Sequence, residues 1–454
     1  MERKKFSWGV VIGLALLGFS RSTGWALNKG LSFPLLSSYT ESAFIKGTIL
    51  ALEGFIGILI PPLLGYYSDT LRSKHGRRRP FIMIGGLLAG IAVLMIYTSY
   101  ALGVPLAGFA LTLAVFYFSM HIYTAQFRAL MPDTIESGER GKASGVITLF
   151  EWAGNLFLFG LAGFLIAKAV AETGESESIK ALAQTPYLKI PFIVTSLFLI
   201  GAALFVYFVV REPKAPEIME DESLVNYLKS IVTNRDFLKF YAAQTLWWMS
   251  FEFVAIFLYG ILAFILHGSA SEENVKAVTS LGLYLMALFN VTVLLGALPG
   301  GLIYDKIGRR LSIIVGGIVF ALPQLWGWFI KTQTQIVIAL ALAGLGWGIL
   351  MVASYPVIGD LLTQYEKEAF TGRYYGFFEA TRSLPVLLAG TIGGAIVDLA
   401  GGNYRVLFPI GAIMVLVAMP MIWSMKNLRW ARNDPGNNSP CLDFVFCFYL
   451  CSGL

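Results

Sequence analysis

The sequence is poor in cysteine, histidine and charge, and each shortage excludes a class of protein. All three cysteines follow residue 440, so the rest of the chain can form neither a disulfide nor a thiolate metal site. Each of the three histidines is followed by Gly or Ile, which excludes the His-Glu-x-x-His motif of zinc proteases. The Gly-x-x-x-x-Gly-Lys-Ser/Thr phosphate loop is also missing. We therefore expect no metal centre, no cofactor and no enzymatic activity.

The shortage of charge is confined to long blocks. Of the 454 residues, 14% are charged and 56% are hydrophobic, whereas a soluble domain has about 25% charged residues. Apolar runs of about 20 residues recur along the chain, and each can cross ~30 Å of hydrocarbon as a helix. Because lipid offers the backbone no hydrogen bonds, such runs fold as helices. The sequence predicts an all-α membrane protein with twelve transmembrane helices, at residues 6–27, 44–67, 81–100, 104–127, 143–167, 190–210, 238–266, 281–303, 312–330, 336–360, 374–399 and 404–425.

Basic residues between the predicted helices set the orientation of the chain. With the N-terminus inside, the cytosolic loops and termini hold about three times as many Lys and Arg as the opposite side. We therefore expect a multi-pass protein of the cell membrane with both termini in the cytosol. The same bias accounts for the net charge of +6, so we expect the lipid bilayer, and no nucleic acid, as a partner.

Two loops in different halves of the chain share one pattern, Gly-x-x-x-Asp followed by Gly-Arg-Arg. It runs through Asp69, Arg77 and Arg78 after the second predicted helix, and through Asp305, Arg309 and Arg310 after the eighth. The copies lie about half the chain apart, which indicates an internal repeat. We predict two pseudo-repeated six-helix bundles at 1–210 and 238–425, a cytosolic linker at 211–237, and a cytosolic tail at 426–454 to which we assign no role.

The loop pattern resembles the signature of the major facilitator superfamily. The first copy, GYYSDTLRSKHGRRRPFI, and the stretch from Gln126 to Asp133 resemble a narrower group, the glycoside–pentoside–hexuronide:cation symporters and the related sucrose–proton symporters. The resemblance implies alternating access, in which the two halves rock about a central cavity. It also implies a gating role for both loops. Their aspartates accept hydrogen bonds at helix ends, and their arginines gain partners in one state and lose them in the other.

Two charges are predicted at the same depth in the membrane. A charge at bilayer depth costs ~2.5–3.5 kcal/mol on insertion scales, so we expect such a residue to be paired or to have a function. Arg21 in the first helix and Glu53 in the second both lie about 22 Å from the cytosolic surface, and we predict that they pair. The pair is either a static contact or a site that handles protons or substrate. Our hypothesis is that Glu53 carries the coupled proton and Arg21 modulates it, with His121 as the rival carrier.

Polar and aromatic residues on three predicted helices form the candidate substrate site. The fourth helix carries four of them on one face. The resemblance implies that this helix lines the cavity and that Arg128 contacts the sugar, whereas sucrose carriers have an Asp at the position of Tyr117. Indole rings stack on sugars and charged or amide groups bind hydroxyls, although the tryptophans also fit packing or interfacial roles and Arg128 fits a snorkelling role. The predicted substrate-binding residues are Arg21, Trp25, Tyr117, His121, Thr124, Arg128, Gln244, Trp248 and Glu252.

These features together predict a secondary active transporter, a proton-coupled symporter of a glycoside or disaccharide. The sodium symporters of the resembling group carry two acidic residues where this chain has Gly57 and Pro61, so we expect H⁺ as the coupling ion. The alternative on the same scaffold is a proton-driven exporter of drugs or other metabolites. A non-transporting membrane sensor is a hypothesis from another class. We expect a small sugar as the substrate and no obligate protein partner.

Overall fold

The computed structural model describes residues 8–70, 75–135, 140–174, 179–210, 212, 233–365 and 371–425. Within these residues, twelve helices are long and apolar enough to cross a membrane, so the predicted number of transmembrane helices is confirmed. The predicted tail lies outside the described residues, as does all of the predicted linker except Glu212 and 233–237.

The first bundle contains the first six of these helices. They are α1 (Trp8–Ser37), α2 (Ala43–Thr70), α3 (Arg79–Ala101), α4 (Leu106–Thr134), α5 (Arg140–Thr173) and α7 (Pro186–Val209), and the short α6 (Ile179–Leu182) lies between α5 and α7. Each packs against at least one other helix of its own bundle, and the most extensive of these contacts are those of α1 with α5 and of α3 with α4.

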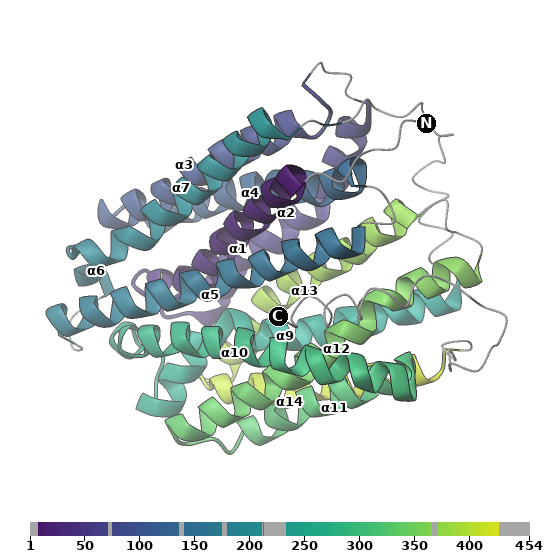
Figure 1. Ribbon diagram of the computed structural model, residues 1–454. Helices are drawn as coiled ribbons and strands as arrows, with labels where there is room; N and C mark the ends of the chain where they lie inside the picture. Colours follow the sequence, from purple (N-terminus) through teal and green to yellow (C-terminus); the bar gives the residue numbers. More distant parts are fainter. Residues whose placement is uncertain are drawn as a thin grey trace, which may run out of the picture.

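The second bundle repeats this arrangement with the other six helices. They are α9 (Arg235–His267), α10 (Glu272–Ile307), α11 (Arg309–Gly327), α12 (Gln333–Gln364), α13 (Thr371–Leu399) and α14 (Leu407–Trp423), with the 3-10 helix η3 (Tyr404–Val406) before α14. Figure 1 shows both bundles with their helices running from one end of the molecule to the other. The fold is therefore all-α, with two six-helix bundles side by side.

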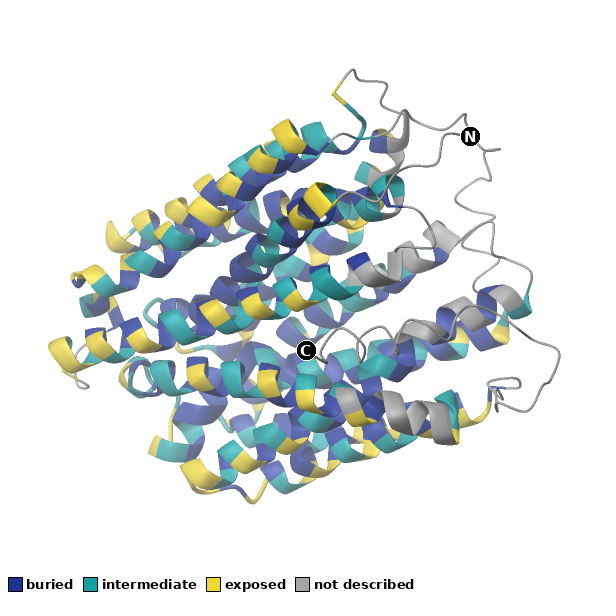
Figure 2. Cartoon of the chain, viewed as in Figure 1, coloured by how far each residue is buried: buried dark blue, intermediate teal, exposed yellow. Residues whose placement is uncertain are grey.

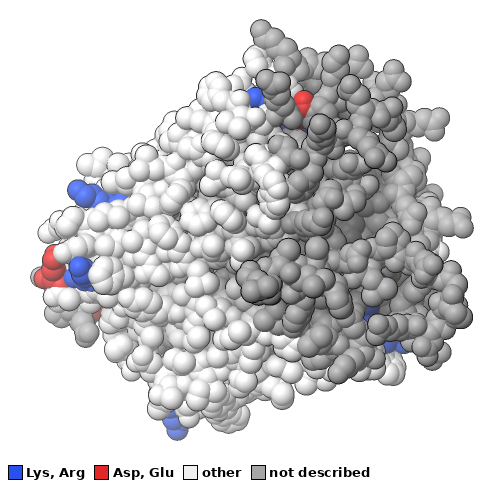
Figure 3. All heavy atoms as spheres, in the orientation of Figure 1, with Lys and Arg blue, Asp and Glu red and all other residues white. Residues whose placement is uncertain are grey.

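The outer surface of the bundles is apolar, as a lipid-facing surface must be. Large hydrophobic side chains such as Phe208 (73% exposed) and Leu197 (66% exposed) point outward from the middle or ends of helices. Figure 2 shows exposed positions along the outer helices, and in Figure 3 the visible Lys, Arg, Asp and Glu side chains lie toward the two ends. On the face that Figure 3 shows, the described residues between the ends display almost no charge, as expected of a surface that lipid covers.

The first helix is ten residues longer at its C-terminal end than predicted, since α1 continues to Ser37. The sequence suggested an end at residue 27 because Asn28 and Lys29 interrupt the apolar run. In the structure both side chains have partners inside the protein, and the chain beyond them is buried again from Gly30 to Ser37. A buried partner thus allows polar residues to continue a membrane helix.

The two bundles are joined by hydrogen bonds at one end, the end that carries α6 and the loop between α1 and α2 (left in Figure 1). We call this the closed end. Asp398, at the end of α13, accepts hydrogen bonds from the backbone of Ala43 (2.8 Å) and Phe44 (3.1 Å) and from Ser42 Oγ (2.5 Å) at the start of α2. Lys276 of α10 donates to the Gly174 carbonyl oxygen at 2.8 Å after α5.

Helices α2 and α13 form the most extensive contact between the bundles, and they pack backbone to backbone. A Cβ atom added to Gly47 would collide with the carbonyl oxygen of Gly390, and one added to Gly390 would collide with that of Gly47. A Cβ atom added to Gly394 would likewise collide with the carbonyl oxygen of Ala43. Because glycine has no side chain, the two helices approach more closely than other residues allow.

Candidate functional site

One face of α1 is turned toward the second bundle, where Lys29 bonds to Glu252 of α9. Arg21, Trp25 and Lys29 are four residues apart, so they lie on one side of the helix. All three side chains are half-buried, whereas nearly all their neighbours on α1 are buried. These residues form the first wall of the candidate site.

Arg21 and Arg128 share one carboxylate, that of Glu151. Arg21 Nη2 lies 2.8 Å and Arg128 Nη2 lies 3.2 Å from Glu151 Oε1, which brings α1, α4 and α5 together. Glu151 is only 11% exposed, whereas Arg128 is 42% exposed. One carboxylate therefore bonds two guanidinium groups, of which that of Arg128 is the more exposed.

Lys29 links the two bundles in the middle of the helices. Its Nζ lies 2.9 Å from both carboxylate oxygens of Glu252, which belongs to α9. Glu252 is 4% exposed and Lys29 is 27% exposed. Sequence reasoning missed Lys29 because it was placed in a loop beyond the first helix. Its position could have been inferred from the spacing, because a residue eight positions after Arg21 lies on the same face of a helix.

Glu53 of α2 is held by a neutral side chain. Asn28 Nδ2 donates to Glu53 Oε2 at 3.1 Å, and Asn28 Oδ1 accepts from Tyr117 (3.0 Å) and Ser32 (2.7 Å). Because Oδ1 is occupied by two hydroxyl donors, the amide must present Nδ2 to Glu53. In the part of the chain that the structure describes, Glu53 forms no ion pair, although Lys29 and Glu252 are close enough to act on its charge.

The predicted pair between Arg21 and Glu53 is wrong. Arg21 points to Glu151, and Glu53 bonds to Asn28, which lies seven residues further along α1. The cation that acts on Glu53 from α1 is Lys29. Arg21 on α1 and Glu53 on α2 do lie on the predicted helices, but their side chains bond to different partners.

His121 lies against α2 close to Glu53. Its Nε2 is 3.0 Å from the Glu53 carbonyl oxygen, and its ring centroid is 5.3 Å from that of Trp25. A Cβ atom at Gly57 would come within 2.6 Å of the His121 ring, so the glycine creates the space for it. Gly57 is where the resembling sodium symporters carry an acid, and here that space holds an imidazole.

The remaining predicted residues of α4 differ in exposure. Tyr117 is fully buried, so it contacts Asn28 and not open space. Thr124 is half-buried, and its Oγ1 has no hydrogen-bond partner among the described residues.

On α9, Trp248 belongs to an aromatic cluster of the second bundle. The guanidinium of Arg382 lies 4.4 Å from the centre of the Trp248 ring, and the Trp347 ring is 4.8 Å away, edge to face. Trp248 Nε1 has no hydrogen-bond partner within the described part of the chain. Gln244 is fully buried and donates to Phe378 O (3.1 Å) and Thr381 Oγ1 (2.7 Å), so it joins α9 to α13.

The predicted gating arginines of the first loop bind the end of α4. Arg77 Nη2 lies 2.7 Å from Asp133 Oδ1, and Arg78 Nε lies 3.1 Å from Asp133 Oδ2. Arg78 also donates to Ser68 of α2 and, at 3.3 Å, to Gln126 of α4. The side chain of Asp69 lies outside the described residues.

The second loop is described in part. Arg310 donates to the carbonyl oxygen of Met425, and its guanidinium lies 5.8 Å from the Trp423 ring centre, so it binds the end of α14. Arg309 begins α11, and the side chain of Asp305 lies outside the described residues.

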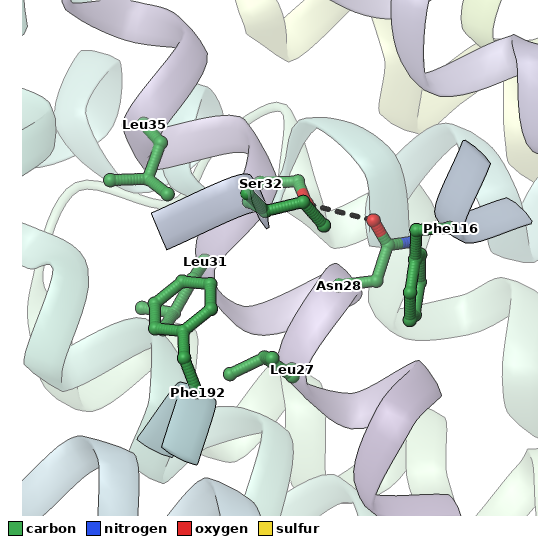
Figure 4. Close-up of a pocket in the computed structure, with 8 residues that line it drawn as sticks. Leu27, Asn28, Leu31, Ser32, Leu35, Phe116 and Phe192 are labelled. Atoms are coloured by element: carbon green, nitrogen blue, oxygen red, sulfur yellow. Dashed lines mark hydrogen bonds between the residues drawn. The ribbon is translucent and has the colours of Figure 1, made fainter. Parts of the chain in front are cut away.

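A cavity inside the first bundle does not have the size of a substrate site. Its volume is about 10 Å³, which is room for about one water molecule. Figure 4 shows it beside the hydrogen bond from Ser32 to Asn28. It is lined by Leu27, Asn28, Leu31, Ser32, Leu35, Ile96, Phe116 and Phe192. The half-buried residues between the bundles are therefore the better candidate site.

The chain is similar to known membrane carriers. The family model described as Major Facilitator Superfamily matches residues 10–284 and 252–442. Sucrose transport protein SUC4 of Arabidopsis thaliana is 26% identical over 223 residues, which is 44% of this chain and 43% of that protein. Sucrose transport protein SUC3 of the same plant is 29% identical over 154 residues, which is 30% and 26% of the two chains. The matched region thus spans less than half the length of these curated relatives.

Solved structures with the same fold cover nearly the whole chain. A D-xylose-proton symporter matches with a TM-score of 0.68 and 16% identity, covering 92% of this chain and 98% of that one. The nucleoside transporter NupG matches with a TM-score of 0.66 and 13% identity, over 92% and 98%.

Proposed function

Because the chain belongs to the major facilitator superfamily and is an integral membrane transporter, we propose that it is a proton-coupled sugar symporter that works by alternating access. Its curated relatives are named sucrose transport proteins, which supports a sugar as the substrate. We further propose that the bundles at 1–210 and 238–425 are the two rocking domains, that 211–237 is the linker between them, and that both termini lie in the cytosol of a cell-membrane protein.

The observation that carries the proposal is the environment of Glu53. A carboxylate in the middle of a membrane helix persists if it is paired, neutralised or used. Glu53 accepts from an amide whose orientation is fixed by Tyr117 and Ser32. A carboxylate and the carbonyl oxygen of a carboxylic acid both accept such a bond, so this contact tolerates either protonation state. Glu53 is therefore suited to bind and release a proton.

The half-buried aromatic residues of the candidate site suit a sugar. Trp25 on the first bundle and Trp248 on the second are both half-buried, and indole rings stack on the C–H faces of sugars. The side chain of Arg128 is 42% exposed, and a guanidinium group can donate hydrogen bonds to the hydroxyl groups of a sugar. Tyr117, where sucrose carriers have an Asp, then has a supporting role through Asn28, and the proton-binding acid is on α2.

Uptake of labelled sucrose into proteoliposomes tests the proposal. We expect accumulation when the outside is more acidic than the inside, and a collapse of accumulation when a proton ionophore is added. Glu53→Gln should abolish accumulation but keep sucrose exchange across membranes without a gradient. Glu41→Gln, which removes an exposed carboxylate from the loop before α2, is the matched control and should accumulate sucrose normally. Accumulation by Glu53→Gln would show that Glu53 does not carry the proton, and efflux driven by the gradient would indicate an exporter.

A further inference from the structure

Lys29 has a position that no other residue of α1 shares. Its ammonium group is bonded to both oxygens of Glu252, across the boundary between the bundles. It also acts electrostatically on Glu53, which is on its own side of that boundary. One cation is therefore available to two carboxylates, of which one belongs to the second bundle and the other to the first.

We propose that Lys29 is the positioning residue that couples the protonation of Glu53 to the contact between the bundles. This inference rests on the proposed function of Glu53 as the proton carrier. When Glu53 is protonated, Glu252 is the carboxylate that balances Lys29, and the ion pair between the bundles is strong. When Glu53 loses its proton, its negative charge competes for Lys29 and weakens the pair with Glu252. Proton binding thereby stabilises the arrangement in which the closed end is shut.

The burial of the pair makes this competition effective. Glu252 is almost fully buried, and interactions between charges are screened much less there than at an exposed surface. Among the described residues, the other charged or titratable groups that act on these three are Arg382 from α13 and Tyr117 and His121 from α4, of which His121 binds the Glu53 backbone. We take these three groups as unchanged between the two protonation states of Glu53, so that they shift the balance without reversing it.

The four-carbon stem of Lys29 permits the exchange. Its side chain is 27% exposed, so it is not enclosed on all sides. A lysine ammonium is a compact charge with three donors on a flexible stem, and it binds in many directions. An arginine would be expected to prefer one planar, two-pronged contact with Glu252.

The experiment measures the distance between the two bundles at the closed end, and it needs no sugar. Spin labels are placed at Leu102→Cys, between α3 and α4, and at Thr334→Cys, near the start of α12; both residues are exposed. The three native cysteines, which all follow residue 440, are replaced by serine. Pulsed electron resonance on the full chain in nanodiscs then gives the ratio of closed to open molecules across a pH titration.

In the wild type we expect this ratio to fall as the pH rises, by about tenfold or more, which is a typical size for such coupling. Lys29→Gln should remove most of this pH dependence, and Lys29→Arg should restore part of it. Glu53→Gln should also remove the dependence, and the double variant Lys29→Gln with Glu53→Gln should show no additional effect, because both changes act on one coupling.

The matched control is Lys276→Gln. Lys276 also bonds the two bundles, through the Gly174 carbonyl oxygen, although it is fully buried whereas Lys29 is 27% exposed. Its replacement should lower the closed fraction at every pH and leave the pH dependence as in the wild type. A merely structural role for Lys29 predicts the same behaviour for Lys29→Gln, and that result would overturn the proposal.

A charge reversal separates the contact between the bundles from the competition for Lys29. Lys29→Glu combined with Glu252→Lys restores an ion pair between α1 and α9, but it places a negative charge where Glu53 needs a cation. We expect a closed end that no longer responds to pH as the wild type does. A wild-type response would contradict the proposal.

The results also distinguish a failure of this inference from a failure of the proposed function. If sucrose is not transported but the pH dependence is lost in Lys29→Gln and kept in Lys276→Gln, the sugar is wrong and the inference stands. If Glu53→Gln keeps the pH dependence, Glu53 is not the proton carrier and the inference falls with it. If Glu53→Gln loses the dependence and Lys29→Gln keeps it, only the inference is overturned.

Discussion

The bonds of Asp398 at the closed end predict how strongly one side chain holds the two bundles together. Asp398 is on α13, and its carboxylate accepts from two backbone N–H groups at the start of α2 and from Ser42 Oγ. The first N–H groups of a helix have no partners within the helix, so an acceptor there stabilises the helix end. Here that acceptor comes from the other bundle, and the bonds must break when the closed end opens.

The size of the effect follows from these contacts. The loss of one hydrogen bond costs about 0.5–1.5 kcal/mol, and a negative charge at a helix N-terminus contributes about 0.3–1 kcal/mol. Asp398→Asn keeps one acceptor oxygen, but it loses the charge and one of the two oxygens that are used in the structure. We therefore expect the closed end to be destabilised by about 1–2 kcal/mol, which shifts the ratio of closed to open molecules about 5–30-fold toward open.

The assay is the same distance measurement between labels at Leu102→Cys and Thr334→Cys. The control is Glu41→Gln, which removes a negative charge from the exposed loop before α2. Asp398→Asn should enlarge the open population at every pH, whereas the control should leave it unchanged within about twofold, as for most surface substitutions. Equal populations in Asp398→Asn and the control would refute the view that these bonds hold the end shut.

Two further predictions concern the middle of the molecule and the contact between α2 and α13. Glu151→Gln leaves Arg21 and Arg128 without their shared carboxylate, so we expect the free energy of unfolding to fall by about 2–4 kcal/mol. This is less than for a fully buried pair, because Arg128 is partly exposed. Thermal unfolding in detergent measures the change, and an unchanged midpoint would contradict it. Gly390→Leu should prevent the closed end from shutting, because a side chain there would collide with the backbone of α2. Gly160→Leu should have little effect, since a Cβ atom there contacts nothing. The distance between the labels at Leu102→Cys and Thr334→Cys distinguishes the two outcomes.

The sequence predicts the number and order of the membrane helices well, because twenty apolar residues in a row have one stable conformation in lipid. Their ends are harder to predict. The apolar pattern of α1 stops near Asn28, yet the helix continues for about three more turns, since Lys29 and Asn28 find partners on other helices. Whether a polar residue ends a membrane helix depends on tertiary contacts that the local sequence does not contain.

Pairings within the candidate site are predictable only in part. Depth along a helix follows from residue number, at about 1.5 Å per residue, and this led to the expectation that Arg21 meets Glu53. The direction in which a side chain points depends on how the helix is rotated against its neighbours, and Arg21 points to Glu151 on α5. The partners of Arg77 and Arg78 show the same limit, because Asp133 is distant in sequence but lies at the same end of the molecule.

The glycine contact between α2 and α13 has a consequence for the speed of the transport cycle. Closing an interface normally immobilises side chains, which costs about 0.5–1.5 kcal/mol of rotamer entropy for each long side chain. Where Gly47 meets Gly390 there are no side chains to order. The two helices can therefore separate and meet again many times without a conformational search at each closure, and the contact is suited to repeated turnover.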